Sequence, residues 1–111
     1  MLAPTRLEGT EPFIFIASTE ISTGTVSGNS VMANTVWHDF STEYPDYVPI
    51  GIASFGLQGT LGNSLVICSF STQGTQVGAR CRNVTSSSAS GKITVKAIML
   101  RKEFFSQLMG V

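Results

Sequence analysis

Cys68 and Cys81 carry the most reactive side chains in this sequence. A turn signal at residues 72–74 separates two segments of strand type, and folding the chain there places both cysteines on one face of a hairpin. Two cysteines are too few for a disulfide scaffold or a four-ligand metal site. Three interpretations follow: a pair of buried reduced thiols, which is favoured, a cross-strand disulfide, or a catalytic thiolate, which no nearby base supports.

His38 is the only histidine, and it stands beside Asp39 with Glu43 and Asp46 close in sequence. A histidine with carboxylates can bind a metal ion or act as a general base. A zinc site usually has three or four ligands, and no cysteine recurs near this segment. We therefore expect a solvated strand end. With no nucleophile motif or phosphate-binding loop elsewhere, the sequence predicts no catalytic residue, no metal site, no cofactor and no enzyme activity.

Aromatic residues gather in residues 37–47, and the overlapping segment 41–49 holds two prolines, which favours a loop. Rings on a loop can stack on sugars or anchor a protein interface, so Trp37, Tyr44 and Tyr47 are the candidate ligand-binding residues. The favoured alternative is structural: Trp37 and Phe40 fill the core at a strand end, and the two tyrosines lie over its rim.

The elements that must position these residues are strands. Residues 92–101 show the clearest pattern, because apolar side chains alternate there with Lys92, Thr94 and Lys96. From Ile98 onward both faces are apolar, which predicts that the end of this strand is covered by Phe104 and Phe105 or by a neighbouring chain. The candidate oligomer contacts are therefore Ile98, Leu100, Phe104 and Phe105.

Turn residues divide the rest of the chain into further segments of strand type. We expect strands at residues 11–21, 25–27, 30–40 with an interruption near Asn34, 50–55, 64–71 and 75–83. The first contains Phe13-Ile14-Phe15-Ile16, a run typical of a strand buried on both sides. Seven to eight short strands and no convincing helical period predict an all-β fold, an antiparallel β-sandwich of jelly-roll-like type. Residues 11–103 form this domain, with an N-terminal extension at 1–10 and a C-terminal tail at 104–111.

Composition limits the partners of this domain. Charged residues make up 13% of the 111-residue chain, and seven basic residues balance seven acidic ones. A charge-poor, neutral surface argues against nucleic acid and suits a subunit that assembles. No apolar run reaches the roughly 20 residues of a membrane-spanning helix. Met1-Leu2-Ala3-Pro4 lacks the pattern of a signal peptide, which favours synthesis in the cytosol.

Residues 47–101 also contain several short motifs in a characteristic order. A Tyr-x-Pro-Ile-Gly-Ile segment starts at Tyr47, and Arg82-Asn83, a Ser-rich turn, Ser90-Gly91 and an alternating strand follow in order. This order resembles the β-sandwich modules that end many bacteriophage tail fibres and related virion appendages. The resemblance implies a homotrimer that contacts other virion proteins, attaches to a host-surface glycan or protein, and assembles in the bacterial cytoplasm.

Two alternatives to the tail fibre module stay open. Such modules usually follow a long stalk, whereas this chain has about ten residues before its first expected strand, so a capsid decoration or head-fibre protein fits as well. A stand-alone carbohydrate-binding domain, acting through Trp37, Tyr44 and Tyr47, is the other alternative.

Overall fold

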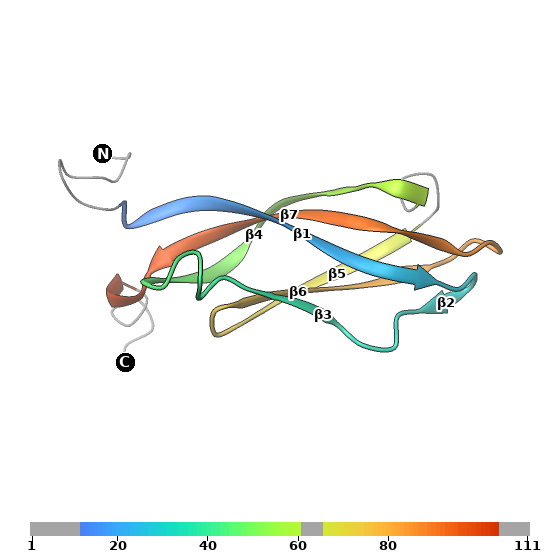
Figure 1. Cartoon of the computed structure of the whole chain (residues 1–111), viewed down its shortest axis with the longest axis horizontal. Helices are drawn as coiled ribbons and strands as arrows, with labels where there is room; N and C mark the ends of the chain where they lie inside the picture. Colours follow the sequence, from blue (N-terminus) through green and yellow to red (C-terminus); the bar gives the residue numbers. More distant parts are fainter. Residues whose placement is uncertain (1–11, 61–65, 105–111) are drawn as a thin grey trace.

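The computed structural model of the chain describes residues 12–60 and 66–104, which contain seven strands. The strands lie in two layers (Figure 1). One sheet has the order β1-β7-β4, with strands Ile14–Val26, Ala89–Arg101 and Tyr47–Leu57. In the other sheet β6 (Gln76–Asn83) is central, with β5 (Val66–Gln73) on one side and β2 (Ser30–Val31) and β3 (Val36–Asp39) on the other. Every pairing is antiparallel, so the predicted all-β sandwich is confirmed.

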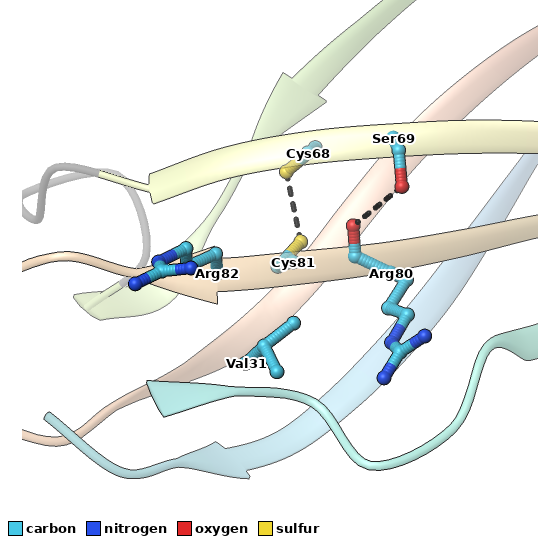
Figure 2. Close-up of a pocket in the computed structure, with 6 residues that line it drawn as sticks. All are labelled: Val31, Cys68, Ser69, Arg80, Cys81 and Arg82. Atoms are coloured by element: carbon cyan, nitrogen blue, oxygen red, sulfur yellow. Dashed lines mark hydrogen bonds between the residues drawn. The ribbon is translucent and has the colours of Figure 1, made fainter. Parts of the chain in front are cut away.

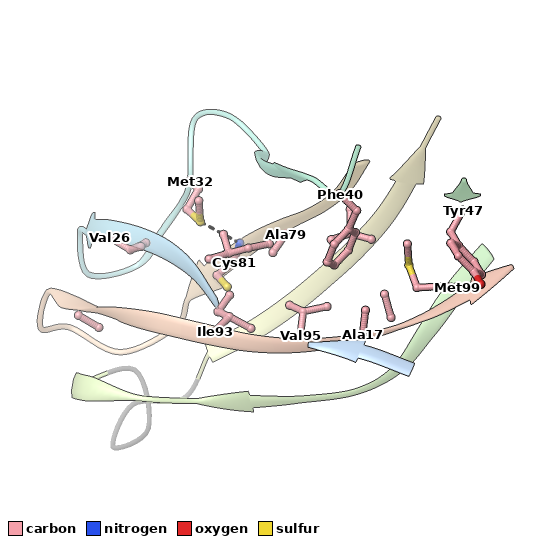
Figure 3. Packing of buried hydrophobic residues seen from close by; sticks show 14 residues of the cluster. Ala17, Val26, Met32, Phe40, Tyr47, Ala79, Cys81, Ile93, Val95 and Met99 are labelled. Carbon is pink, nitrogen blue, oxygen red and sulfur yellow. Dashed lines mark hydrogen bonds between the residues drawn. The ribbon is translucent and has the colours of Figure 1, made fainter. Parts of the chain in front are cut away.

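The core lies between the two sheets, as Figure 3 shows. The alternation in β7 points Ile93, Val95, Ala97 and Met99 inward, and all four are fully buried. Val77, Ala79 and Cys81 of β6 meet them from the opposite sheet, and Phe40 closes the core where β3 ends. The alternating apolar pattern therefore identified the inner face of both central strands.

The first strand is longer than its sequence predicts. Residues 22–24 were expected to end it, yet β1 continues through them to Val26, with a register shift against β7 between Ser22 and Gly24. Gly24 has a φ of +65°, a conformation that glycine adopts without steric cost, so the strand absorbs one extra residue as a bulge.

Strand β4 also exceeds its prediction, because it starts at Tyr47 in the segment expected to be a loop. Pro49 lies inside this strand opposite Met99. A proline cannot donate to a ladder of hydrogen bonds, but β4 is an edge strand and needs no donor on its outer side.

The Ser-rich loop between β6 and β7 is held by a buried asparagine. The Asn83 amide donates to the Val26 carbonyl (3.2 Å) and the Ser87 carbonyl (2.7 Å), while its oxygen accepts from the Thr85 backbone N–H (3.0 Å) and hydroxyl (2.7 Å). Asn83 opens a formal glycosylation sequon, but its side chain is 0% exposed. A glycosyl group has no access to that nitrogen in the folded chain.

The predicted N-terminal extension and residues 105–111 of the predicted tail lie outside the described residues. Within the described part of the tail, residues 102–104 are helical.

Candidate functional site

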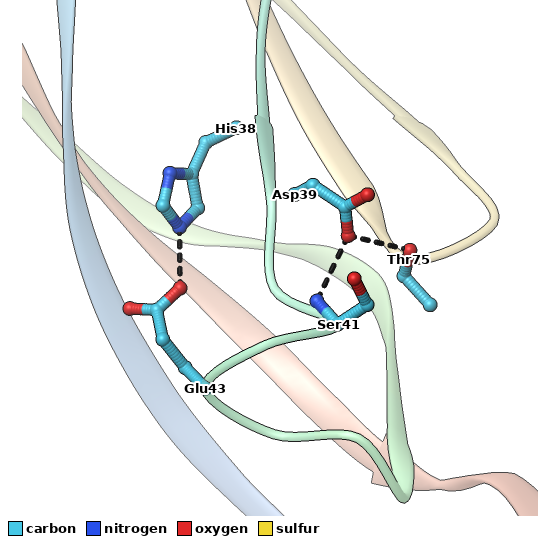
Figure 4. Close-up of polar contacts among 5 residues, drawn as sticks. All are labelled: His38, Asp39, Ser41, Glu43 and Thr75. Atoms are coloured by element: carbon cyan, nitrogen blue, oxygen red, sulfur yellow. Dashed lines mark hydrogen bonds and ion pairs between the residues drawn. The ribbon is translucent and has the colours of Figure 1, made fainter.

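The polar residues around His38 form separate local contacts, which Figure 4 shows. His38 Nε2 lies 2.7 Å from Glu43 Oε1, whereas Asp39 Oδ1 accepts from the Thr75 hydroxyl (2.7 Å) and the Ser41 backbone N–H (2.8 Å). Over residues 12–60 and 66–104 no three His, Cys, Asp or Glu side chains are grouped to hold a metal ion. These contacts join the end of β3 to the following loop and to the β5–β6 hairpin.

The hydrogen bonds that Asp39 accepts from Thr75 and Ser41 make the stability of the fold depend on pH in acid. The hydrogen bond from Thr75, followed by that from Ser41, lowers the pKa of Asp39 to about 2. Because the folded-state pKa is depressed, the stabilisation is complete above the ordinary value of 3.8 and is lost as pH falls from there towards 2. We expect Asp39→Asn to flatten the dependence of the urea midpoint on pH across this window.

The matched control for this prediction is Asp46→Asn, which makes the same chemical change in the same loop and removes neither hydrogen bond. Equal flattening by both variants would contradict the role of Asp39.

The three aromatic candidates do not share one surface. Tyr47 is only 5% exposed, donates its hydroxyl proton to the Pro12 carbonyl and packs edge-on against Phe15, with ring centroids 4.8 Å apart. Tyr44 is half-buried and meets the same Phe15 ring at 5.0 Å. Tyr47 is therefore a core residue with no free ring face, which corrects the prediction that it lies on a ligand-binding loop.

Trp37 lies on the outer face of the other sheet. It stands opposite Gly78, and a Cβ added to Gly78 would lie 2.7 Å from Trp37 Cε3, so the indole packs directly over the β6 backbone. The side chain remains 38% exposed. Of the three predicted ligand-binding residues, Trp37 alone combines a large ring with substantial exposure.

A larger apolar surface lies on the outer face of the β1-β7-β4 sheet. At one end of this face β1 contributes Ile14 and Ile16, β7 contributes Ile98 and Leu100, and β4 contributes Val48. We call these five residues the apolar patch. Ile16 is 52% exposed, Ile98 is half-buried, and Leu100 is 7% exposed because Ile14 and Val48 flank it on the two neighbouring strands.

The apolar patch gives two of the predicted oligomer contacts different roles. Ile98 reaches the surface, whereas Leu100 is buried within the chain between its strand partners Ile14 and Val48. Phe104 packs on Phe13 with ring centroids 5.0 Å apart, so it covers part of the chain's own surface at this end. Phe105 lies outside the described residues.

Sequence reasoning missed Ile14 and Ile16, although the signal was present in residues 13–16. That run was expected to be buried on both sides, but among residues 12–60 and 66–104 only one side is covered. Phe15 faces the core, and Ile16 faces outward with no second layer from these residues above it.

The rest of the outer face of this sheet is polar. Lys92 lies 3.6 Å from Glu20 across the β1–β7 pair, and the Gln58 amide donates to the Thr94 hydroxyl at 2.6 Å. Lys96 and Ser18, which pair with each other, separate these contacts from the apolar patch. The apolar patch is thus a bounded surface at one end of the sheet.

The two cysteines lie opposite each other on β5 and β6, with their Sγ atoms 2.8 Å apart as free thiols (Figure 2). Burial, followed by the contact with Cys68, raises the pKa of the Cys81 thiol to about 12. A thiol with so high a pKa and no exposure is a poor nucleophile towards molecules in solution at neutral pH, and the sulfur of Cys68 is the partner within its reach.

Comparisons with protein-family models, with curated protein sequences and with solved structures find no match to this chain. No helix in the described part of the chain is long and apolar enough to cross a membrane. The resemblance to phage fibre modules therefore stays a prediction from the sequence.

Proposed function

We propose that this chain is a structural module of a bacteriophage virion, a tail fibre or appendage component that assembles with further copies of itself. The observation that carries the proposal is the apolar patch. An isoleucine that is 52% exposed on the open face of a sheet loses favourable burial unless another surface covers it.

A second copy of this chain is the occupant that fits the apolar patch best. Residues 13–16 have the composition of a strand buried on both sides, yet the described part of the chain leaves Ile16 on the second side 52% exposed. A neighbouring copy that packs over the apolar patch would bury the second side of this strand. Balanced charge, with seven basic and seven acidic residues, keeps electrostatic repulsion between copies low.

The trimeric state and the place in a virion are the finer parts of the proposal, and both come from the sequence resemblance. A β-sandwich whose sheet carries one bounded apolar end suits packing around a symmetry axis. A capsid decoration or head-fibre protein would use the same surface for assembly. The apolar patch therefore supports assembly but does not distinguish a tail location from a capsid location.

Sedimentation velocity over a series of protein concentrations tests the assembly step. We expect a species with the mass of three chains at micromolar concentration. A single species with the mass of one chain across the whole series would remove the proposal.

Host attachment is the second part of the proposed role, and Trp37 is the residue that favours it. An indole supported from below by Gly78 and 38% exposed offers a rigid platform for a sugar ring or a protein side chain. We expect Trp37→Ala to abolish binding on a glycan array while the sedimentation profile stays unchanged. Glycan binding that survives the substitution would remove Trp37 from this role.

A further inference from the structure

We propose that Cys68 and Cys81 form a reversible disulfide that closes β5 onto β6. The structure holds the reduced form of this pair. Thiols at these two positions need almost no rearrangement to become a bridge, and this inference is independent of the assembly role.

The hairpin turn fixes the pairing of the two cysteines. Gly74 has a φ of +58° and leads the two-residue turn between Gln73 and Gln76. The register runs without a shift from that turn to Cys68 opposite Cys81. Glycine at the first turn position locks the register, because a one-residue slip would move each cysteine to the other face.

The hydrogen-bonding pattern shows that this is the kind of pair that a disulfide can join. The Cys81 carbonyl accepts from the Met32 N–H at 3.0 Å, and the Cys81 N–H donates to Met32 Sδ at 3.2 Å. The backbone polar groups of Cys81 therefore point away from β5, and Cys68 and Cys81 form a non-hydrogen-bonded pair. The Cα atoms of such pairs lie about 4.5 Å apart, within the range that disulfides span.

Burial gives the two thiols unequal access to an oxidant. Cys81 is fully buried in the core cluster, while its neighbour Arg82 is exposed on the opposite face of β6. Cys68 is half-buried on β5, the edge strand of its sheet. An oxidant therefore reaches Cys68 first, and Cys81 acts as the thiol that resolves the intermediate.

Glutathione disulfide is an oxidant of the required class. The Cys68 thiolate attacks one of its sulfur atoms, a mixed disulfide forms, and one glutathione leaves with the proton that Cys68 lost. Cys81 then loses its proton, attacks the sulfur of Cys68 and displaces the second glutathione. The two protein thiols give up two electrons in total, and glutathione disulfide is reduced to two thiols.

Mass spectrometry of the intact chain after incubation with glutathione disulfide tests this inference. We expect the wild-type chain to lose the mass of two hydrogen atoms. In Cys81→Ser, which has no resolving thiol, we expect a stable glutathione adduct on Cys68. In Cys68→Ser we expect no modification, because the remaining thiol is buried.

Thermal unfolding provides a second readout on the same samples. The oxidised wild-type chain should unfold roughly 10 °C above the reduced chain, because the bridge restricts the unfolded state. Dithiothreitol should reverse the shift, and the double serine variant should show none.

Three outcomes would overturn the inference. They are a wild-type chain that keeps both thiols free under oxidant while folded, a glutathione adduct that never closes to the internal bridge, and a covalent dimer linked through Cys68.

Discussion

The Ile16→Lys variant is expected to sediment as a single chain at concentrations where the wild-type chain is a trimer. Ile16 is the most exposed member of the apolar patch, so lysine fits there in the isolated chain at little cost. In the assembly the substitution removes about 2 kcal/mol of apolar burial at each contact and adds the cost of desolvating a charge. Since 1.4 kcal/mol changes an association constant tenfold, each contact should weaken by more than about 100-fold.

The matched control for this prediction is Val84→Lys. Val84 is also an exposed aliphatic residue, but it lies in the Ser-rich loop at the other end of β7. This variant should keep the wild-type mass. Dissociation of both variants, or of neither, would show that the apolar patch is not the contact surface.

Gly91→Ala is expected to cost about 3 to 5 kcal/mol of unfolding free energy, a large part of the 5–15 kcal/mol that holds a typical domain. Gly91 has a φ of +154°, and a Cβ added there would lie 1.9 Å from the Gln58 carbonyl oxygen. That carbonyl has little freedom to move, because the Gln58 N–H donates to the Lys92 carbonyl at 2.9 Å. The overlap must therefore be relieved by separating β4 from β7, the central strand of the sheet.

Two further alanine variants divide this cost into its causes. Gly24→Ala meets open space but keeps a φ of +65°, so it should cost about 1–2 kcal/mol from backbone strain alone. Gly56→Ala meets open space without a positive φ and should change stability by less than about 0.5 kcal/mol. Urea unfolding of the three variants measures the series. A Gly91→Ala cost no larger than that of Gly24→Ala would contradict the close contact between β4 and β7.

The sequence predicted the central strands well because their environment follows from a local pattern. Lys92, Thr94 and Lys96 alternate with apolar residues that all lie in the core. The cysteine pair was predictable for a similar reason, since a short turn leaves little choice of register between the two arms of a hairpin.

The edge strands were predicted less well, because their limits depend on tertiary contacts. A local pattern cannot show that Gly24 forms a bulge within a strand, or that the strand containing Pro49 lies at the edge of its sheet. Tyr47 was misplaced for the same reason. Its burial comes from Phe15 and the Pro12 carbonyl, which are more than thirty residues away in sequence.

The apolar patch shows where sequence reasoning about the site ends. A run that is apolar on both faces identifies residues that need burial on both sides, and it identified Ile98 and residues 13–16 in this way. It does not say whether the cover is the second sheet of the same chain or another molecule. The structure answers this for Phe15, which packs on Tyr44 and Tyr47, and leaves Ile16 on the open face of the sheet.

Photo-cross-linking from position 16 tests the central claim most directly. A photoreactive phenylalanine analogue replaces Ile16 in one sample and Val84 in another, and the products are separated by mass after irradiation. Assembly through the apolar patch predicts covalent links between copies from position 16, with attachment sites on the outer face of the β1-β7-β4 sheet, and none from position 84. Irradiated chains that stay unlinked at position 16 while sedimenting as an oligomer would contradict it.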